Sequence, residues 1–414
     1  MDASQLMVWL VVALVAAGVV VAVVLAVRRH RWIQSLKERG WRFVDNPKLE
    51  SVLTLSCPPF GQGFRRDVDD QVLGEAGPAR TPFQVVEYRS EHGSHRVAAL
   101  RLPLPLPELH VSSGPSPRVG VAAAPHPHPR WQVRTDDPAF ADTVLRAAAG
   151  PLEALAALGP VDLSVDGQDL VALGVPREAD ELAPLLEALA AVVASLPPQE
   201  LERFRQPDPE HRFRFYRRPD WVFHGDRDDM LSRVRHTRGG FGHQAEQVVT
   251  GTGQGLPFIA LRHRWKTQRT VVESDGKGGT RTRTVTDHHS EDLFEMTLPA
   301  PWPLLGVGGG GWFRPGEKVE LEWEQFNDRF PVRSTHPRFA YDVLHPRQME
   351  YLMAAAPPAF EVDGTVLRVS SQHDSEWLWR TVDVLTGFLA RVPGWVWKNV
   401  GAAEPPPFTR AELG

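Results

Sequence analysis

The sequence predicts an α+β protein, with an N-terminal transmembrane helix followed by two tandem copies of a strand-helix-hairpin-helix domain. Three observations favour this fold class. Residues 6–27 form an uninterrupted apolar run, DPAFADTVL at 137–145 returns as HPRFAYDVL at 336–344, and further stretches recur in the same order along both halves. Because chance matches do not keep their order, we interpret the recurrence as a tandem duplication.

The composition sets the broad class of protein. The chain has 414 residues, of which 42% are hydrophobic and 23% charged, as is usual for a globular protein with more than one core. Its formal net charge of -5 argues against a nucleic-acid-binding protein, which would carry a strongly basic face. A single cysteine, Cys57, excludes a disulfide framework within the chain and a cysteine-rich zinc module.

The apolar run at 6–27 has the length of a membrane-spanning helix, since roughly 20 apolar residues cross the hydrocarbon core. A secretory signal peptide is the alternative, but it would carry positive charge before a shorter apolar stretch. Here Asp2 precedes the run and the basic residues follow it. We therefore expect a single-pass protein of the cell (inner) membrane, with the N-terminus outside, the bulk of the chain cytoplasmic and the lipid bilayer as a partner.

Residues 28–40 are predicted to form a basic juxtamembrane segment. Arg28, Arg29 and Arg31 follow the apolar run directly. Setting the topology is a sufficient role for these residues. They are also candidates to face anionic lipid headgroups, which attract basic side chains close to a membrane.

The first copy is assigned to 41–197 and the second to 221–397, with a linker at 198–220 between them and a C-terminal tail at 398–414. Each copy is expected to contain several strands, a helix, a VDG hairpin turn and a closing amphipathic helix. Between the copies the chain is charged and contains prolines, which favours a linker.

The repeated phrase is predicted to be a helix start followed by a core stripe. Proline follows Asp137 in the first copy and His336 in the second, and proline is favoured at the first helical position because its missing N–H would be unpaired there. Phe140, Val144 and Leu145 then fall on one face of the helix. We interpret the phrase as structural.

An insertion distinguishes the second copy. The spacing between matching stretches widens there, which locates the insertion at 267–292. It contains two β-rich runs joined by DGKGG, a hairpin signal. We expect a projecting β-ribbon.

The candidate binding residues lie in the second copy, which contains nine of the thirteen tryptophans. Trp377 and Trp379, with the neighbouring His373 and Asp374, are the candidates for a ligand groove. Packing of the copy's own core is the alternative, and it is the more common use of aromatic side chains.

No sequence motif for nucleophilic or metal chemistry accompanies these residues. The sequence lacks HExxH, paired CxxC and GxSxG, and GVGGGG at 306–311 lacks the lysine of a phosphate-binding loop. We therefore predict no catalytic residue, no metal site and no cofactor.

Phe326, Phe330, Val332 and Ser334 form an F-x-x-x-F-x-V-x-S phrase, followed by a loose leucine-proline step and a strand hairpin. In this respect residues 325–370 resemble a bacterial domain family of unknown function. The whole layout resembles uncharacterised single-pass membrane proteins of high-GC actinobacteria. The resemblance implies a structural motif and no activity.

The expected function is a non-enzymatic binding or scaffolding module that is anchored at a membrane and takes another protein as its candidate partner. What the copies share is structural, and their loops differ. Two alternatives stay open. One is a hydrolase-like enzyme with its site around His373 and Asp374, and the other is a sensor of anionic lipid or of the membrane surface.

Overall fold

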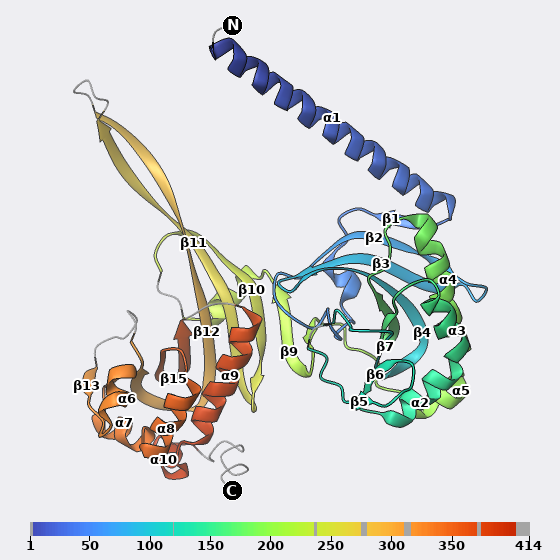
Figure 1. The fold of residues 1–414 in the computed structure, drawn as a ribbon. Helices are drawn as coiled ribbons and strands as arrows, with labels where there is room; N and C mark the ends of the chain where they lie inside the picture. Colours follow the sequence, from blue (N-terminus) through green and yellow to red (C-terminus); the bar gives the residue numbers. More distant parts are fainter. Residues whose placement is uncertain are drawn as a thin grey trace. The chain divides into compact units, whose positions relative to one another are not determined.

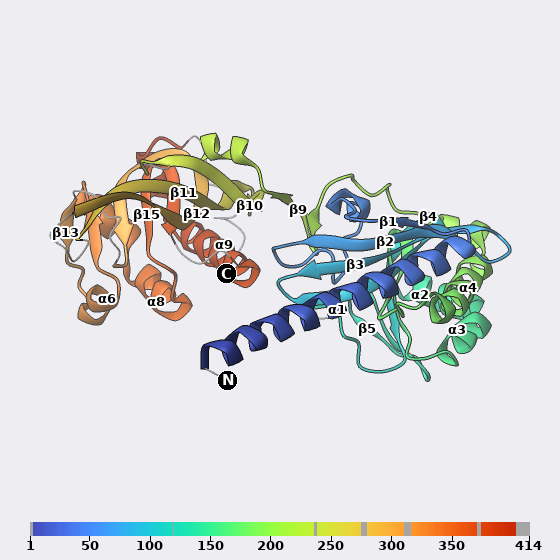
Figure 2. The ribbon, with the colours of Figure 1, turned by 90° about the horizontal axis from the view of Figure 1, so that it is seen from above.

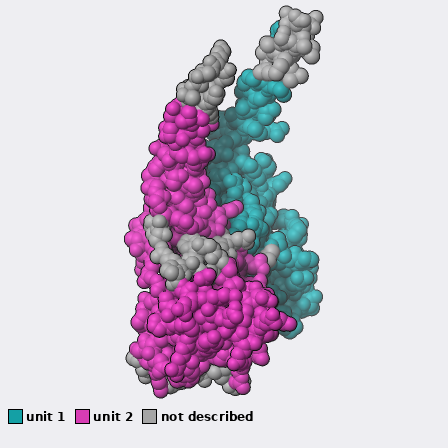
Figure 3. All heavy atoms as spheres, turned by 90° about the vertical axis from the view of Figure 1, so that its left-hand side faces the viewer, with its two compact units in different colours: residues 1–61, 66–211 teal, residues 62–65, 212–414 magenta. Residues whose placement is uncertain are grey.

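The computed structural model describes residues 3–118, 120–235, 238–274, 280–309, 316–370 and 374–402, and Figure 1 labels its helices and strands. The chain divides into two compact units (Figure 3). Unit 1 contains residues 1–61 and 66–211, and unit 2 contains residues 62–65 and 212–414. Each unit is built on an antiparallel sheet of its own.

The sheet of unit 1 has the strand order β1-β2-β3-β4-β6-β5, and β7 pairs with β4. Its strands are β1 Arg42–Val44, β2 Asp67–Ala76, β3 Thr81–Ser90, β4 Gly93–Ser112, β5 Pro125–His126, β6 Gln132–Thr135 and β7 Asp162–Leu173. Close packing explains Gly74 in β2. A Cβ there would lie 2.7 Å from both Phe83 and Trp41, whose rings pack edge to face with centroids 5.3 Å apart.

Helices α2, α3, α4 and α5 lie together on one face of this sheet (Figure 1). The helices of unit 1 are α1 Ala3–Glu38, η1 Leu49–Val52, α2 Pro138–Ala147, α3 Ala149–Ala156, α4 Ala179–Ser195, α5 Pro198–Leu201 and η2 Glu202–Phe204. Asp137 caps α2 by accepting the backbone N–H of Phe140, and Phe140, Val144 and Leu145 are buried. The predicted helix start and core stripe are therefore confirmed in this unit.

The sheet of unit 2 has the order β13-β14-β12-β11-β10-β9-β8, and β15 pairs with β12. Its strands are β8 Arg214–Phe215, β9 Arg218–Gly225, β10 Phe241–Gly253, β11 Leu256–Ser274, β12 Thr280–Val307, β13 Glu317–Val319, β14 Val332–Ser334 and β15 Phe360–Ser370. Its helices are η3 Asp228–Arg233, α6 Glu324–Arg329, α7 Pro337–Val343, α8 Pro346–Ala355, α9 Ser375–Ala390 and α10 Gly394–Asn399. Figure 2 shows α6, α8 and α9 on one side of this sheet.

The predicted fold class, an α+β chain of tandem strand-helix-hairpin-helix copies, is wrong. Each unit is mainly a large antiparallel sheet with long strands, of which β12 has 28 residues. The VDG stretches are not hairpin turns, because Gly167 lies inside β7 and Gly364 inside β15, with φ of 59° and 62°. A glycine with positive φ occurs both in hairpin turns and at bends within a strand. The VDG motif therefore does not show which of the two a chain forms.

The two sheets do share an order of pairing. In unit 1 the strands β2-β3-β4-β6 pair in this order, and in unit 2 β10-β11-β12-β14 pair in the corresponding order. In addition, β7 pairs with β4 as β15 pairs with β12. The recurring sequence stretches thus fall on sheet strands more than on a helix-and-hairpin unit.

The predicted transmembrane helix at 6–27 is overturned, and with it the expected single-pass placement in the inner membrane. In the part of the chain that the structure describes, no helix is long and apolar enough to cross a membrane. The predicted juxtamembrane segment at 28–40 lies mostly within the same helix. Helix α1 continues to Glu38, and it packs Trp32 and Leu36 into the core of unit 1.

The predicted insertion at 267–292 falls on the far ends of β11 and β12. These strands pair from Thr267 with Asp287 to Ser274 with Thr280, and they form the two-stranded ribbon seen in Figure 1. The predicted linker at 198–220 contains α5 and η2 in unit 1 and β8 in unit 2.

Candidate functional site

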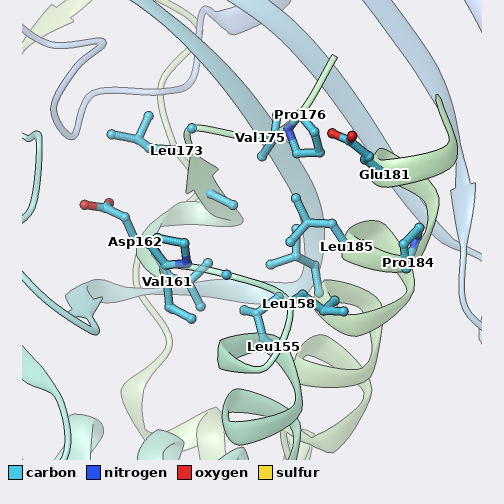
Figure 4. A pocket seen from close by; sticks show the side chains of 16 residues that line it. Leu155, Leu158, Val161, Asp162, Leu173, Val175, Pro176, Glu181, Pro184 and Leu185 are labelled. Atoms are coloured by element: carbon cyan, nitrogen blue, oxygen red, sulfur yellow. The ribbon is translucent and has the colours of Figure 1, made fainter. Parts of the chain in front are cut away.

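An apolar pocket lies in unit 1, between the two ends of β7 and the helices α3 and α4 (Figure 4). Its volume is about 380 Å³, within the range of small-ligand pockets. Leu155 and Leu158 come from α3 and the residues after it, and Pro184 and Leu185 come from α4. Side chains from β7 and its flanking loops complete the lining: Val161, Leu163, Ala172, Leu173 and Val175.

Both ends of β7 reach this pocket because the strand is bent. Its first part pairs Leu163 with Val111, and its last part pairs Leu170 with Leu100, with register shifts between the two parts. Gly167 stands at the bend, and its positive φ makes glycine the favoured residue there.

Arg118 fixes the two ends of β7 to one another. Its side chain is 1% exposed and pairs with Asp162 at the start of β7. It also donates to the carbonyl oxygen of Val171 near the other end, at 3.1 Å, and to that of Pro58 at 2.6 Å. A buried guanidinium that satisfies three acceptors holds the pocket wall in place.

Helix α4 supplies the opposite wall. Leu182, Leu186 and Leu189 follow the helical repeat and are buried in the core. Leu185 lies at the edge of that stripe and is only partly buried, and it lines the pocket. Asp180 and Glu181 lie in the first turn of α4, where negative charge is favourable to the helix dipole.

One free carboxylate marks the mouth of the pocket. Of the lining residues, only Asp162 and Glu181 have acidic side chains, and Asp162 is held by Arg118 and Ser116. Figure 4 shows the Asp162 carboxylate pointing away from the pocket and the Glu181 carboxylate beside Pro176. Glu181 is exposed, and within the described residues it has no ion-pair partner. Leu158 also lines the pocket and is 52% exposed.

The tryptophans predicted to bind a ligand lie on α9 in unit 2. Trp379 packs against Trp221, with ring centroids 5.2 Å apart, and the guanidinium of Arg218 lies 4.9 Å from its ring. Trp377 is half-buried. These contacts fit core packing at Trp379 and do not bring the two tryptophans into one groove.

Asp374 serves the helix itself. It is the N-cap of α9, and its carboxylate accepts the backbone N–H of Trp377 at 2.8 Å. His373 lies outside the described residues, so the alternative of an enzyme site at His373 and Asp374 stays a prediction.

The three arginines predicted to face lipid lie on α1 and differ in their contacts. Arg29 pairs with Asp45 at 2.8 Å and with Asp70 at 3.0 Å, both within unit 1. Arg28 and Arg31 are exposed. A role of these residues with lipid stays a prediction.

The sequence does not predict the residues of the pocket, because they come from helices and a strand that lie apart along the chain. Helix α4 gives no signal either, because Leu182, Leu185, Leu186 and Leu189 fall at i, i+3, i+4 and i+7, which is the spacing of one ordinary apolar face. No pattern in the sequence indicates that the two ends of β7 meet.

Comparison with known proteins gives little help with the function. No family model matches the chain, and no curated protein does. Among solved structures, the chain is similar to the mycobacterial trehalose monomycolate transport factor A, TtfA, with 14% identity and a TM-score of 0.27, over 42% of this chain and 89% of that one. A TM-score this low carries no argument about fold or function.

Proposed function

We propose that unit 1 is a non-enzymatic binding module, which takes an apolar side chain of a partner protein into the pocket between β7 and α4. A lysine or arginine next to that side chain pairs with Glu181. The observation that supports this proposal most is an apolar pocket lined by the exposed carboxylate of Glu181, which has no ion-pair partner among the residues that the structure describes.

Apolar burial would supply most of the affinity. Full burial of one leucine or phenylalanine side chain is worth about 1.5–3 kcal/mol. Leu158 is already half-exposed at the rim and adds surface that a partner can cover. An exposed ion pair to Glu181 adds at most about 1 kcal/mol, so its role is to select partners by charge.

Binding fits the pocket better than catalysis does. A catalytic site needs a nucleophile or base beside groups that orient it. The lining offers Asp162, which is already held by Arg118, and the lone Glu181. These two carboxylates do not form an acid-base pair.

The proposal is tested with random peptides displayed on phage and selected against the purified full chain. We expect the selected peptides to combine a large apolar residue with an adjacent lysine or arginine. Their affinity is then measured by fluorescence anisotropy for four chains: the natural one, Glu181→Lys, Leu158→Lys and the control Glu187→Lys. Glu187 is exposed on the same helix and does not line the pocket.

Glu181→Lys and Leu158→Lys are expected to weaken binding at least about tenfold, since each removes an attraction and adds a like charge. Glu187→Lys is expected to bind as the natural chain does. Equal affinity in all four chains, or selected peptides without an apolar residue, would show that the pocket is not the binding site.

A further inference from the structure

Three side chains of different chemistry meet in the interior of unit 1, away from the apolar pocket. Cys57, Glu108 and His110 each offer one ligand atom, and these atoms all lie within 4.8 Å of one another. Cys57 is buried, and the side chains of His110 and Glu108 are 8% and 19% exposed. Sulfur, nitrogen and oxygen donors thus face a common point.

The fold positions all three. Glu108 and His110 are two residues apart on β4, so they point to the same face of the sheet. Cys57 lies in the loop before β2, and the carboxylate of Asp166 fixes this loop. It accepts the backbone N–H groups of Ser56 and Cys57, both at 2.7 Å.

His110 has an unmet hydrogen-bonding need. Its Nε2 lies 2.7 Å from a carboxylate oxygen of Glu108. Its Nδ1 is buried and has no hydrogen-bond partner in the parts of the chain that the structure describes. A buried polar atom left without a partner costs about 1–3 kcal/mol, so a ligand bound at Nδ1 itself would be stabilising.

We propose that Cys57, Glu108 and His110 bind a divalent first-row transition-metal ion such as Zn²⁺. A thiolate and an imidazole favour such an ion over Mg²⁺ or Ca²⁺, which prefer oxygen ligands. Around a tetrahedral zinc ion, ligand atoms lie about 3.4–3.6 Å apart. The three ligand atoms all lie within 4.8 Å of one another, and the imidazole of His110 and the carboxylate of Glu108, now 2.7 Å apart, would separate slightly when the ion binds. Three protein ligands leave a fourth position for water.

A hollow in unit 1 borders one of the three side chains, His110. Its volume is about 590 Å³, and His110, Ser112, Arg118 and Arg134 are among its lining residues. The positive charge of Arg118 is balanced by its ion pair with Asp162. A hydrated ion can therefore reach His110 from the hollow without crossing the apolar core.

Binding replaces a proton at sulfur. Burial, followed by the charges of Asp166 and Glu108, raises the pKa of the Cys57 thiol well above its usual range, so the free site holds the thiol form. When the ion binds, the S–H bond breaks, a sulfur–metal bond forms, and the proton leaves to water.

The first test is a titration of the metal-free full chain with Co²⁺, followed by absorption spectroscopy. Cys57 is the single cysteine of the chain, so a cobalt-thiolate charge-transfer band reports this site alone. We expect a band that saturates at one ion per chain and is absent in Cys57→Ser. In His110→Ala the affinity for Co²⁺ is expected to fall at least about tenfold.

His126→Ala is the matched control. His126 lines the same hollow but pairs with Asp142, at 2.9 Å, and is not one of the three residues. Its variant is expected to keep the band and the affinity. Absence of the band in the natural chain at saturating Co²⁺, or an unchanged affinity in His110→Ala, would overturn the proposal.

A second measurement does not depend on variants that fold. X-ray absorption at the zinc edge of the natural chain loaded with one equivalent of Zn²⁺ is expected to show one sulfur at about 2.3 Å, together with nitrogen and oxygen at about 2.0–2.2 Å. A shell of nitrogen and oxygen only would overturn the proposal, because Cys57 would then not be a ligand.

Discussion

Replacing Asp169 with asparagine is expected to stabilise unit 1 at neutral pH. Asp169 lies on β7 with its side chain 11% exposed, and Arg101 lies 3.4 Å away. Burial raises the pKa of the Asp169 carboxyl from 3.8 to about 6, because it outweighs the opposing charge of Arg101. Two pKa units correspond to about 3 kcal/mol.

The sign of the pH dependence follows from the raised pKa. The pKa of the Asp169 carboxyl is higher in the folded state than in the unfolded state, so its protonated form stabilises the fold. This stabilisation is fully present at a pH below the pKa of the unfolded state, and it is lost as the pH rises through about 6. Asparagine does not ionise, so the variant does not lose stability in this pH range. Asp169→Asn is therefore expected to gain up to about 3 kcal/mol over the natural chain at about pH 7.5, and little at about pH 4.

Hydrogen exchange of the amides in β4 and β7 measures this difference within unit 1, because protection reports the free energy of opening. At about pH 7.5 these amides are expected to exchange up to about a hundredfold more slowly in Asp169→Asn than in the natural chain. Faster exchange in the variant would refute the reasoning, since it would mean that the ion pair with Arg101 outweighs the cost of burying the charge.

The structure predicts the effect of three further substitutions on stability. Arg118→Met is expected to lower the unfolding free energy by about 3–5 kcal/mol in urea titrations, because it leaves the largely buried carboxylate of Asp162 without its cation. A loss below about 1 kcal/mol would speak against the ion pair. Asp374→Ala is expected to cost unit 2 about 1 kcal/mol through loss of the α9 cap, seen as faster hydrogen exchange in the first turn of that helix. Trp379→Ala is expected to cost unit 2 about 2–4 kcal/mol in thermal unfolding, whereas a tryptophan kept for ligand binding would leave stability unchanged.

Local features of the fold were predictable from the sequence. Proline after Asp137 and the spacing of Phe140, Val144 and Leu145 predicted a helix with a buried stripe, and both depend only on neighbouring residues. Gly167 was misread because a positive φ does not tell a turn from a bend. Whether the chain reverses or continues there depends on β4, which pairs with both parts of β7.

The long apolar run misled the prediction for a similar reason. Hydropathy describes a segment alone, and it does not reveal that the same helix continues through Arg28 to Glu38 and packs Trp32 into unit 1.

The candidate sites depend on contacts between distant segments. The pocket joins the two ends of β7 to α3 and α4, and the proposed metal site joins Cys57 to residues on β4. Glu108 and His110 carried one usable signal, since two metal-ligating residue types two positions apart on a strand share a face. Their third partner could not be found, because Cys57 is placed by a hydrogen bond to Asp166, far away in the chain.

The pocket between β7 and α4 is proposed to bind an apolar side chain next to a basic one. Methyl NMR of the full chain tests it most directly, with a selected peptide added to leucine-labelled protein. We expect shifts at Leu155, Leu158 and Leu185, which line the pocket, and we expect these shifts to be lost in Glu181→Lys. Shifts confined to leucines outside the pocket, or the same shifts in Glu181→Lys, would contradict it.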